Sequence, residues 1–106
     1  MVKRGEIWLF NLDPTVCSEI QKSRPCVAIS PPEMRDHLRT AIIAPMTTKS
    51  RPAPFRIAVL HGGQKGLILL DQIRAIDKIR LVKKLGFVHA KTLALTLSTL
   101  QETFAQ

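Results

Sequence analysis

The chain is poor in acidic residues, aromatic residues and cysteine, and it has no long apolar run. A bilayer-spanning helix needs roughly 18 consecutive apolar residues. The opening residues, MVKRGEIWLF, lack the extended apolar segment of a signal peptide. We therefore expect a cytoplasmic protein with no membrane contact. The two cysteines, Cys17 and Cys26, form no C-x-x-C pair and no cluster with histidine, so we expect neither a metal nor another cofactor.

Basic residues dominate what is there. Sixteen Lys and Arg oppose eight Asp and Glu, which gives a net charge of +8 and a pI near 10.2. Such a surface favours a polyanionic partner, either nucleic acid or an acidic protein segment, although excess charge also simply keeps a small protein soluble. The length of 106 residues and the 45% apolar content predict one globular domain over residues 1–106.

Short β-forming segments separated by turn residues run along most of the chain. GEIWLFNL and RPCVAIS are typical of strands, and FRIAVL alternates apolar and polar positions as a half-buried strand does. We expect strands at 5–12, 24–30, 40–48, 55–60, 67–77 and through 85–88. PPEMRDHL predicts a short turn or helix, HGGQKG a turn, and 77–80 another short turn. Cys26 lies in an apolar run and is expected in the core.

The C-terminal segment has helical periodicity instead. Leu93, Leu97, Leu100 and Phe104 recur at i, i+4, i+7 and i+11, which is one stripe of an amphipathic helix. About six closely spaced strands followed by one helix predict a mainly β (α+β) fold, a small antiparallel barrel or sheet. Strands do not alternate with helices, so a doubly wound fold is excluded.

Six segments together resemble one protein family. RGEIWLFNLDP, SE, RPCVAIS, APMTT, GLILLDQIRAID and RLVKKLG follow in the order typical of the MazF/PemK toxins of type II toxin–antitoxin systems. The resemblance implies an SH3-like β-barrel (CcdB/MazF-like) with a C-terminal helix, assembled as a homodimer. It also implies a metal-independent, sequence-specific endoribonuclease that cuts single-stranded RNA, including mRNA. An antitoxin with an acidic, flexible segment would inhibit it, and DNA would be met only through that antitoxin.

Metal-free RNA cleavage uses the 2′-OH of the substrate as nucleophile and leaves a 2′,3′-cyclic phosphate and a 5′-OH. The enzyme then has to move two protons and stabilise negative charge on the phosphoryl oxygens. The resemblance places a catalytic arginine at Arg24, whose planar fork can pair with two oxygens, and a catalytic threonine at Thr47. Glu19 is the nearest carboxylate to Arg24 in sequence, and we expect it to act as base or to orient that arginine.

Further residues are expected along the RNA path. Thr48 is an alternative to Thr47 for the catalytic role, because strand alternation sends neighbouring side chains to opposite faces and only one of the two would face the RNA. The histidines at 37, 61 and 89 are expected in exposed loops. The candidates for RNA binding are Gln21, Lys22, Thr48, Lys49, Arg51, Phe55, Arg56, Asp71, Gln72 and Arg74. Trp8 is expected to pack in the core rather than against a base.

Departures from the family pattern keep two alternatives open. Cys17 stands where the family usually has glycine, Ser18 where some members have histidine, and Leu69 where some relatives have an arginine. One alternative is a gyrase-poisoning toxin of the same barrel, as in the CcdB family, against which Arg24 and Thr47 argue. The other is a catalytically silent barrel that binds RNA or antitoxin.

Overall fold

The computed structural model describes residues 2–11 and 23–105, and most of these residues lie in β-strands. Seven strands are present in this part of the chain, one more than the six expected. Two α-helices and two short 3-10 turns accompany them. The strands are β1 Glu6–Asn11, β2 Ser23–Ala28, β3 Thr40–Thr47, β4 Arg56–His61, β5 Gln64–Leu69, β6 Arg74–Asp77 and β7 Leu81–Phe87; the helices are α1 Pro32–His37 and α2 Ala90–Phe104.

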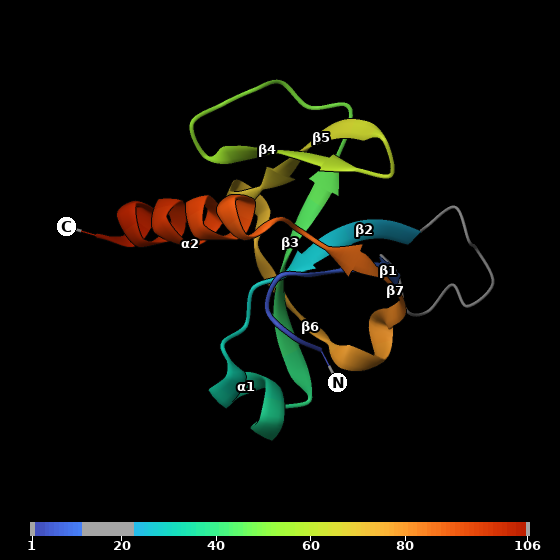
Figure 1. Cartoon of the computed structure of the whole chain (residues 1–106). Coiled ribbons are helices and arrows are strands. Elements are labelled where there is room, and N and C mark those ends of the chain that lie inside the picture. The colour runs from blue at the N-terminus through green and yellow to red at the C-terminus, as the bar shows by residue number, and fades with distance from the viewer. Residues whose placement is uncertain (1, 12–22, 106) are drawn as a thin grey trace.

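The strands form one antiparallel sheet that curls into a half-barrel. Its order is β4-β5-β3-β2-β1-β7, and β6 pairs with the first half of β3. Helix α2 packs against β4, while α1 lies beside the start of β3, away from the β4–β5 hairpin (Figure 1). This confirms the expected small antiparallel β-structure with a C-terminal helix. No helix in the described residues is long and apolar enough to cross a membrane.

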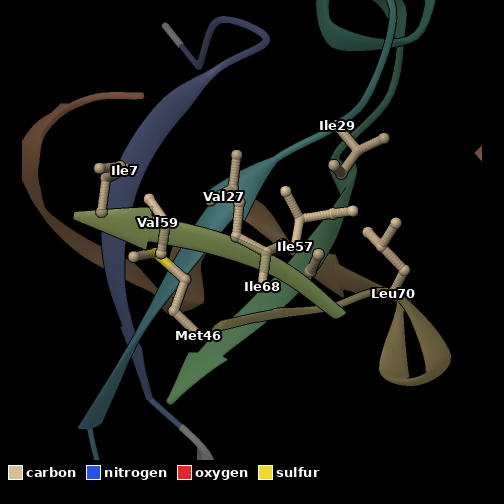
Figure 2. Close-up of a cluster of buried hydrophobic side chains, with 9 residues drawn as sticks. Ile7, Val27, Ile29, Met46, Ile57, Val59, Ile68 and Leu70 are labelled. Carbon is tan, nitrogen blue, oxygen red and sulfur yellow. The ribbon is translucent and has the colours of Figure 1, made fainter. Parts of the chain in front are cut away.

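The main hydrophobic core lies between the β4–β5 hairpin and strands β1, β2 and β3. Its side chains come from all five strands and point toward one another in Figure 2. Leu97 and Leu100 of α2 pack against this core, so two positions of the predicted helical stripe are confirmed. The buried members are Ile7, Val27, Ile29, Ala44, Met46, Ile57, Val59, Ile68 and Leu70.

A second core covers the opposite face of β1, β2 and β3. Its buried members are Val2, Phe10, Cys26, Ala28, Ile43, Ile76 and Leu81, and Trp8 packs against them as expected. Side chains along a strand alternate between the two faces of the sheet. Because both faces of the end of β2 are buried, the sequence from Cys26 through Ile29, the residue after the strand, is continuously apolar and not alternating.

Several predicted boundaries were wrong. The segment predicted as one strand over 67–77 is broken by the 3-10 turn Leu70–Gln72, which separates β5 from β6. The predicted turn HGGQKG is confined to its two glycines. The short turn predicted at 77–80 is confirmed as the 3-10 turn Lys78–Arg80, and the last strand begins directly after it at Leu81. In α2, Phe104 is 72% exposed, while Thr96 is fully buried and donates its hydroxyl to the Thr92 carbonyl.

A buried carboxylate ties the first strand to the last. Glu6 is only 2% exposed, and it forms an ion pair with Lys84 of β7 at 2.8 Å. Its Oε1 also accepts hydrogen bonds from the Trp8 indole, at 3.0 Å, and from the backbone N–H of Lys3, at 2.7 Å. Burial raises the pKa of Glu6, but the bonds from Lys84, Lys3 and Trp8 outweigh it and leave that pKa below its usual value.

Candidate functional site

Arg24 lies at the start of β2, where the strand leaves the two cores. It pairs across the sheet with Phe10, and its neighbour Ser23 donates a 2.9 Å hydrogen bond to the side-chain oxygen of Asn11. Beyond Pro25 the strand is buried, which fixes the backbone that carries the guanidinium. Among the described residues none forms a hydrogen bond or ion pair with the Arg24 side chain, which is exposed. The exposed guanidinium is therefore accessible to an anion.

Thr47 ends β3, the strand next to β2. Its Oγ accepts a 3.2 Å hydrogen bond from the backbone N–H of Lys49, which leaves the hydroxyl proton free to be donated. Thr48 and Lys49 follow in a bend, so strand alternation no longer separates Thr47 from Thr48, and both threonines face the same cavity. Strand β5 approaches the end of β3 closely at this point, and glycine at position 66 permits it, because a Cβ on Gly66 would lie 2.9 Å from the Thr47 carbonyl oxygen.

Two adjoining cavities meet at these residues, and Arg24, Met46, Thr47 and Lys49 line both. The first, of about 240 Å³, lies toward the β4–β5 hairpin, and the second, of about 500 Å³, lies toward β6. The first is also lined by Pro25, Thr48, Val59, His61, Gln64 and Gly66. The second is also lined by Phe10, Pro45, Ser50, Leu69, Gln72 and Arg74.

His61 was expected in an exposed loop, and this was wrong. It is the last residue of β4, is half-buried, and lines the first cavity. The signal was present in the sequence: Phe55, Ile57 and Val59 are alternate apolar positions, of which Ile57 and Val59 are buried, and continuing that period reaches His61. His37 and His89 are exposed, as expected, although His37 is the last residue of α1 and not a loop residue.

The structure brings together only some of the predicted RNA-binding residues. Thr48, Lys49, Gln72 and Arg74 line the cavities with Arg24 and Thr47. The remaining described candidates line neither cavity and form a separate cluster: Arg51, Phe55, Arg56 and Asp71. Glu19, Gln21 and Lys22 lie outside the described residues, as does Cys17.

Arg56 organises that separate cluster. Its guanidinium forms an ion pair with Asp71 at 3.4 Å, donates a 3.0 Å hydrogen bond to the Arg51 carbonyl, and lies 5.6 Å from the centre of the Phe55 ring. These contacts join β4 to the turn after β5 and to the segment that follows β3. Arg56 and Asp71 therefore hold the segment between β3 and β4, which begins with Thr48 and Lys49.

The two cavities have the chemistry of an anion site. Of the described residues that line them, three carry cationic side chains, Arg24, Lys49 and Arg74, and none is a carboxylate. The threonine hydroxyls and the amides of Gln64 and Gln72 add hydrogen-bond donors. Such a set suits a chain of phosphates that crosses both cavities, with one phosphate at the junction beside Arg24 and Thr47.

The fold is that of small toxins with solved structures. A mycobacterial endoribonuclease solved with its cognate antitoxin superposes with a TM-score of 0.82 at 19% identity, over 100% of this chain and 99% of that one. The MazF of a Deinococcus radiodurans MazE–MazF complex gives 0.78 at 22% identity, over 100% of this chain and 98% of that one. At these identities the likeness defines the fold.

Sequence comparison defines the family. Residues 3–104 match the model of the PemK-like, MazF-like toxins of type II toxin–antitoxin systems, and the chain belongs to this family. It is 36% identical to Endoribonuclease PemK of Escherichia coli over 81 residues, covering 72% of this chain but 61% of the relative. It is 33% identical to Endoribonuclease MazF of Staphylococcus saprophyticus over 97 residues, covering 86% of this chain and 81% of the relative.

Proposed function

We propose that this chain is the toxin of a type II toxin–antitoxin pair and a sequence-specific endoribonuclease that acts on single-stranded RNA without a metal ion. The observation that carries the proposal is the junction of the two cavities, where Arg24 and Thr47 come together from neighbouring strands. The relatives named endoribonucleases support the reaction class. Cutting mRNA in the cytoplasm would stop translation and growth.

In the proposed reaction the 2′-oxygen of one nucleotide attacks the adjacent phosphorus and the 5′-oxygen of the next nucleotide leaves. Arg24 pairs with two phosphoryl oxygens and stabilises the charge that grows on them in the transition state. Thr47 donates its free hydroxyl proton to a phosphoryl oxygen. Glu19 remains proposed as a base or as a group that orients Arg24. The products are a 2′,3′-cyclic phosphate and a 5′-OH.

The RNA is proposed to run through both cavities. Lys49 and Arg74 contact its phosphates, and Thr48 and Gln72 donate hydrogen bonds beside them. The other candidates, Gln21, Lys22, Arg51, Phe55, Arg56 and Asp71, would meet nucleotides farther from the cut. Each phosphate contact that is lost lowers the dependence of binding on salt, so Lys49→Ala and Arg74→Ala should each flatten a plot of log affinity against log salt.

The proposed partners are a second copy of the chain and an antitoxin with an acidic, flexible segment. Large apolar side chains exposed on β7 and α2, including Phe87, Leu95 and Phe104, support the homodimer. The net charge of +8 and the cationic cavities support an acidic inhibitor that occupies the RNA path. The solved MazE–MazF complex shows a toxin of this fold with its antitoxin. DNA would be reached only through the antitoxin.

The test is cleavage of a long single-stranded RNA by the purified protein in EDTA, with the ends of the fragments mapped. Discrete cuts with 5′-OH ends are expected. They should disappear with Arg24→Ala, and also at a site whose 5′ nucleotide carries 2′-deoxyribose, since that substrate lacks the nucleophile. Intact RNA after incubation with folded, antitoxin-free protein would reject the nuclease and turn attention to gyrase inhibition and plain RNA binding.

A further inference from the structure

The β4–β5 hairpin brings His61 into the proposed cleavage site by its geometry. Gly62 and Gly63 have φ of 59° and 77°, as a two-residue hairpin turn requires, and the turn sets His61 opposite Gln64. His61 follows Ile57 and Val59 on the inward face of β4 (Figure 2 shows the two apolar residues). The imidazole therefore stands where the buried row ends and the cavity beside Arg24 begins.

A second strand borders the ring from the other side. A Cβ built on Gly86 of β7 would lie 4.0 Å from His61 Cε1, an ordinary van der Waals distance. The ring of His61, carried by the hairpin, thus lies close to β7 at Gly86. The charged side chains that line the same cavity from the other elements are Arg24 of β2 and Lys49 after β3.

Proton transfer is the step for which the other described lining residues are poorly suited. An arginine cannot lose its proton in a protein, and a threonine hydroxyl or an amide is a weak base. No described carboxylate lines either cavity, and Glu6 and Asp71 are engaged elsewhere, Glu6 with Lys84 and Asp71 with Arg56. Imidazole is the side chain that accepts and releases protons near neutral pH, and His61 is the one imidazole among the described lining residues.

We propose that His61 is the general base of the reaction, an inference that rests on the proposed ribonuclease function. The neutral ring takes the proton of the 2′-OH as the 2′-oxygen forms its bond to phosphorus. The bond from phosphorus to the 5′-oxygen breaks with its electron pair, and that oxygen takes a proton from water. The hydroxide so formed removes the proton from the imidazolium, which restores the neutral ring. No oxidant, metal or other reactant is consumed.

The experiment is single-turnover cleavage of one RNA, in EDTA, from pH 5 to pH 9. The variants are His61→Ala and His61→Gln, and the matched controls are His37→Gln and His89→Gln, whose imidazoles are exposed and line neither cavity. General-base catalysis contributes about 10²- to 10⁴-fold, so both His61 variants should lose that much. The rising limb of the wild-type pH profile should disappear with them, and free imidazole should restore part of the rate of His61→Ala.

Three results would overturn the assignment. Cleavage by His61→Gln at a near wild-type rate with the same pH profile would show that the ring moves no proton. Loss of the rising limb in Glu19→Gln, with the limb kept in His61→Gln, would make Glu19 the base. In both cases the wild type still cuts RNA, so the ribonuclease function stands. Intact RNA with the wild type would reject the function and the base together; melting curves of each variant separate these results from misfolding.

Discussion

Two polar regions of the molecule differ in how many hydrogen-bond and ion-pair partners the described residues supply to their charged side chains. Around Glu6, a carboxylate that is 2% exposed has Lys84, Trp8 and the backbone of Lys3 as partners. At the junction of the cavities, Arg24 is exposed and has no hydrogen-bond partner among the described residues. The first region stabilises the fold, and the second is left open to a ligand. Substitutions should therefore affect stability in the first region and activity in the second.

The largest effect is expected from Arg24→Ala. Removing one preorganised donor to transition-state charge costs about 10²- to 10³-fold in rate. Stability should hardly change, because an exposed side chain with no hydrogen-bond partner in the described part of the chain contributes within about 0.5 kcal/mol. Cleavage rates and urea midpoints measure both quantities, and Arg39→Ala, an exposed arginine outside the cavities, is the control. A large drop in the urea midpoint would contradict the separation of the two regions.

Gly66→Ala should lower both stability and activity, since it strains the backbone at the site itself. The new Cβ would stand 2.9 Å from the Thr47 carbonyl oxygen, so the backbone of β3 or β5 has to shift. We expect a stability loss of about 1–3 kcal/mol and, because Thr47 belongs to the backbone that has to shift, a rate loss of up to about 10²-fold. Lys65→Ala, one position earlier and exposed, should change neither. Unchanged cleavage by Gly66→Ala would show that the position of Thr47 is not critical.

Glu6→Gln should give the opposite result to Arg24→Ala, a loss of stability with cleavage retained. Hydrogen bonds to charged groups contribute about 1.5–3 kcal/mol, so unfolding free energy at pH 7 should fall by that order while cleavage per folded molecule persists. The lowered pKa of Glu6 stabilises the fold above the carboxyl's unfolded pKa of about 4.3, and this contribution is lost as pH falls through the folded value. The variant should lack that acid-dependent loss. Urea titrations at pH 7 and pH 4, with exposed Glu102→Gln as control, test this.

The smallest effect concerns Cys26, which is fully buried in the second core. Burial raises the pKa of its thiol to about 12, so the thiolate that reacts with disulfide reagents is nearly absent at neutral pH. In a Cys17→Ser background, Ellman's reagent should label the folded protein only as fast as it unfolds. Rapid labelling of folded protein would show that the strand around Cys26 opens locally.

Elements that bury one face were predictable from the alternation or helical period of their apolar residues. Element ends were not predictable where buried residues continue past them. FRIAVL has one buried face, so its alternation gave the strand and, continued by one step, would have given His61. The end of β5 was misjudged because buried Leu69 and Leu70 extend the apolar run past the strand into a 3-10 turn. Thr96 was missed because its hydroxyl is satisfied within α2, which lets a polar residue be buried.

The candidate site was predictable in part. Arg24 and Thr47 followed from the family resemblance, and the structure places them at one junction. Sequence distance did not show that Gln72 and Arg74 line the cavities while Arg56 and Asp71 pair with each other beside them. That division depends on the 3-10 turn after β5, which places neighbouring residues on different sides of the chain. Side-chain pairing across the fold decides such cases, and it leaves no periodic signal.

The way the β4–β5 hairpin is attached to β3 leaves the width of the first cavity to the packing of the core. Only two residue pairs, Met46 with Ile68 and Thr47 with Leu67, join the hairpin to β3. So short a ladder leaves the spacing between His61 and Arg24 to the volume of the side chains packed underneath, above all Ile57, Val59 and Ile68 (Figure 2). A methyl group added or removed in that layer would change the reach between the two sides of the site while leaving every polar residue in place.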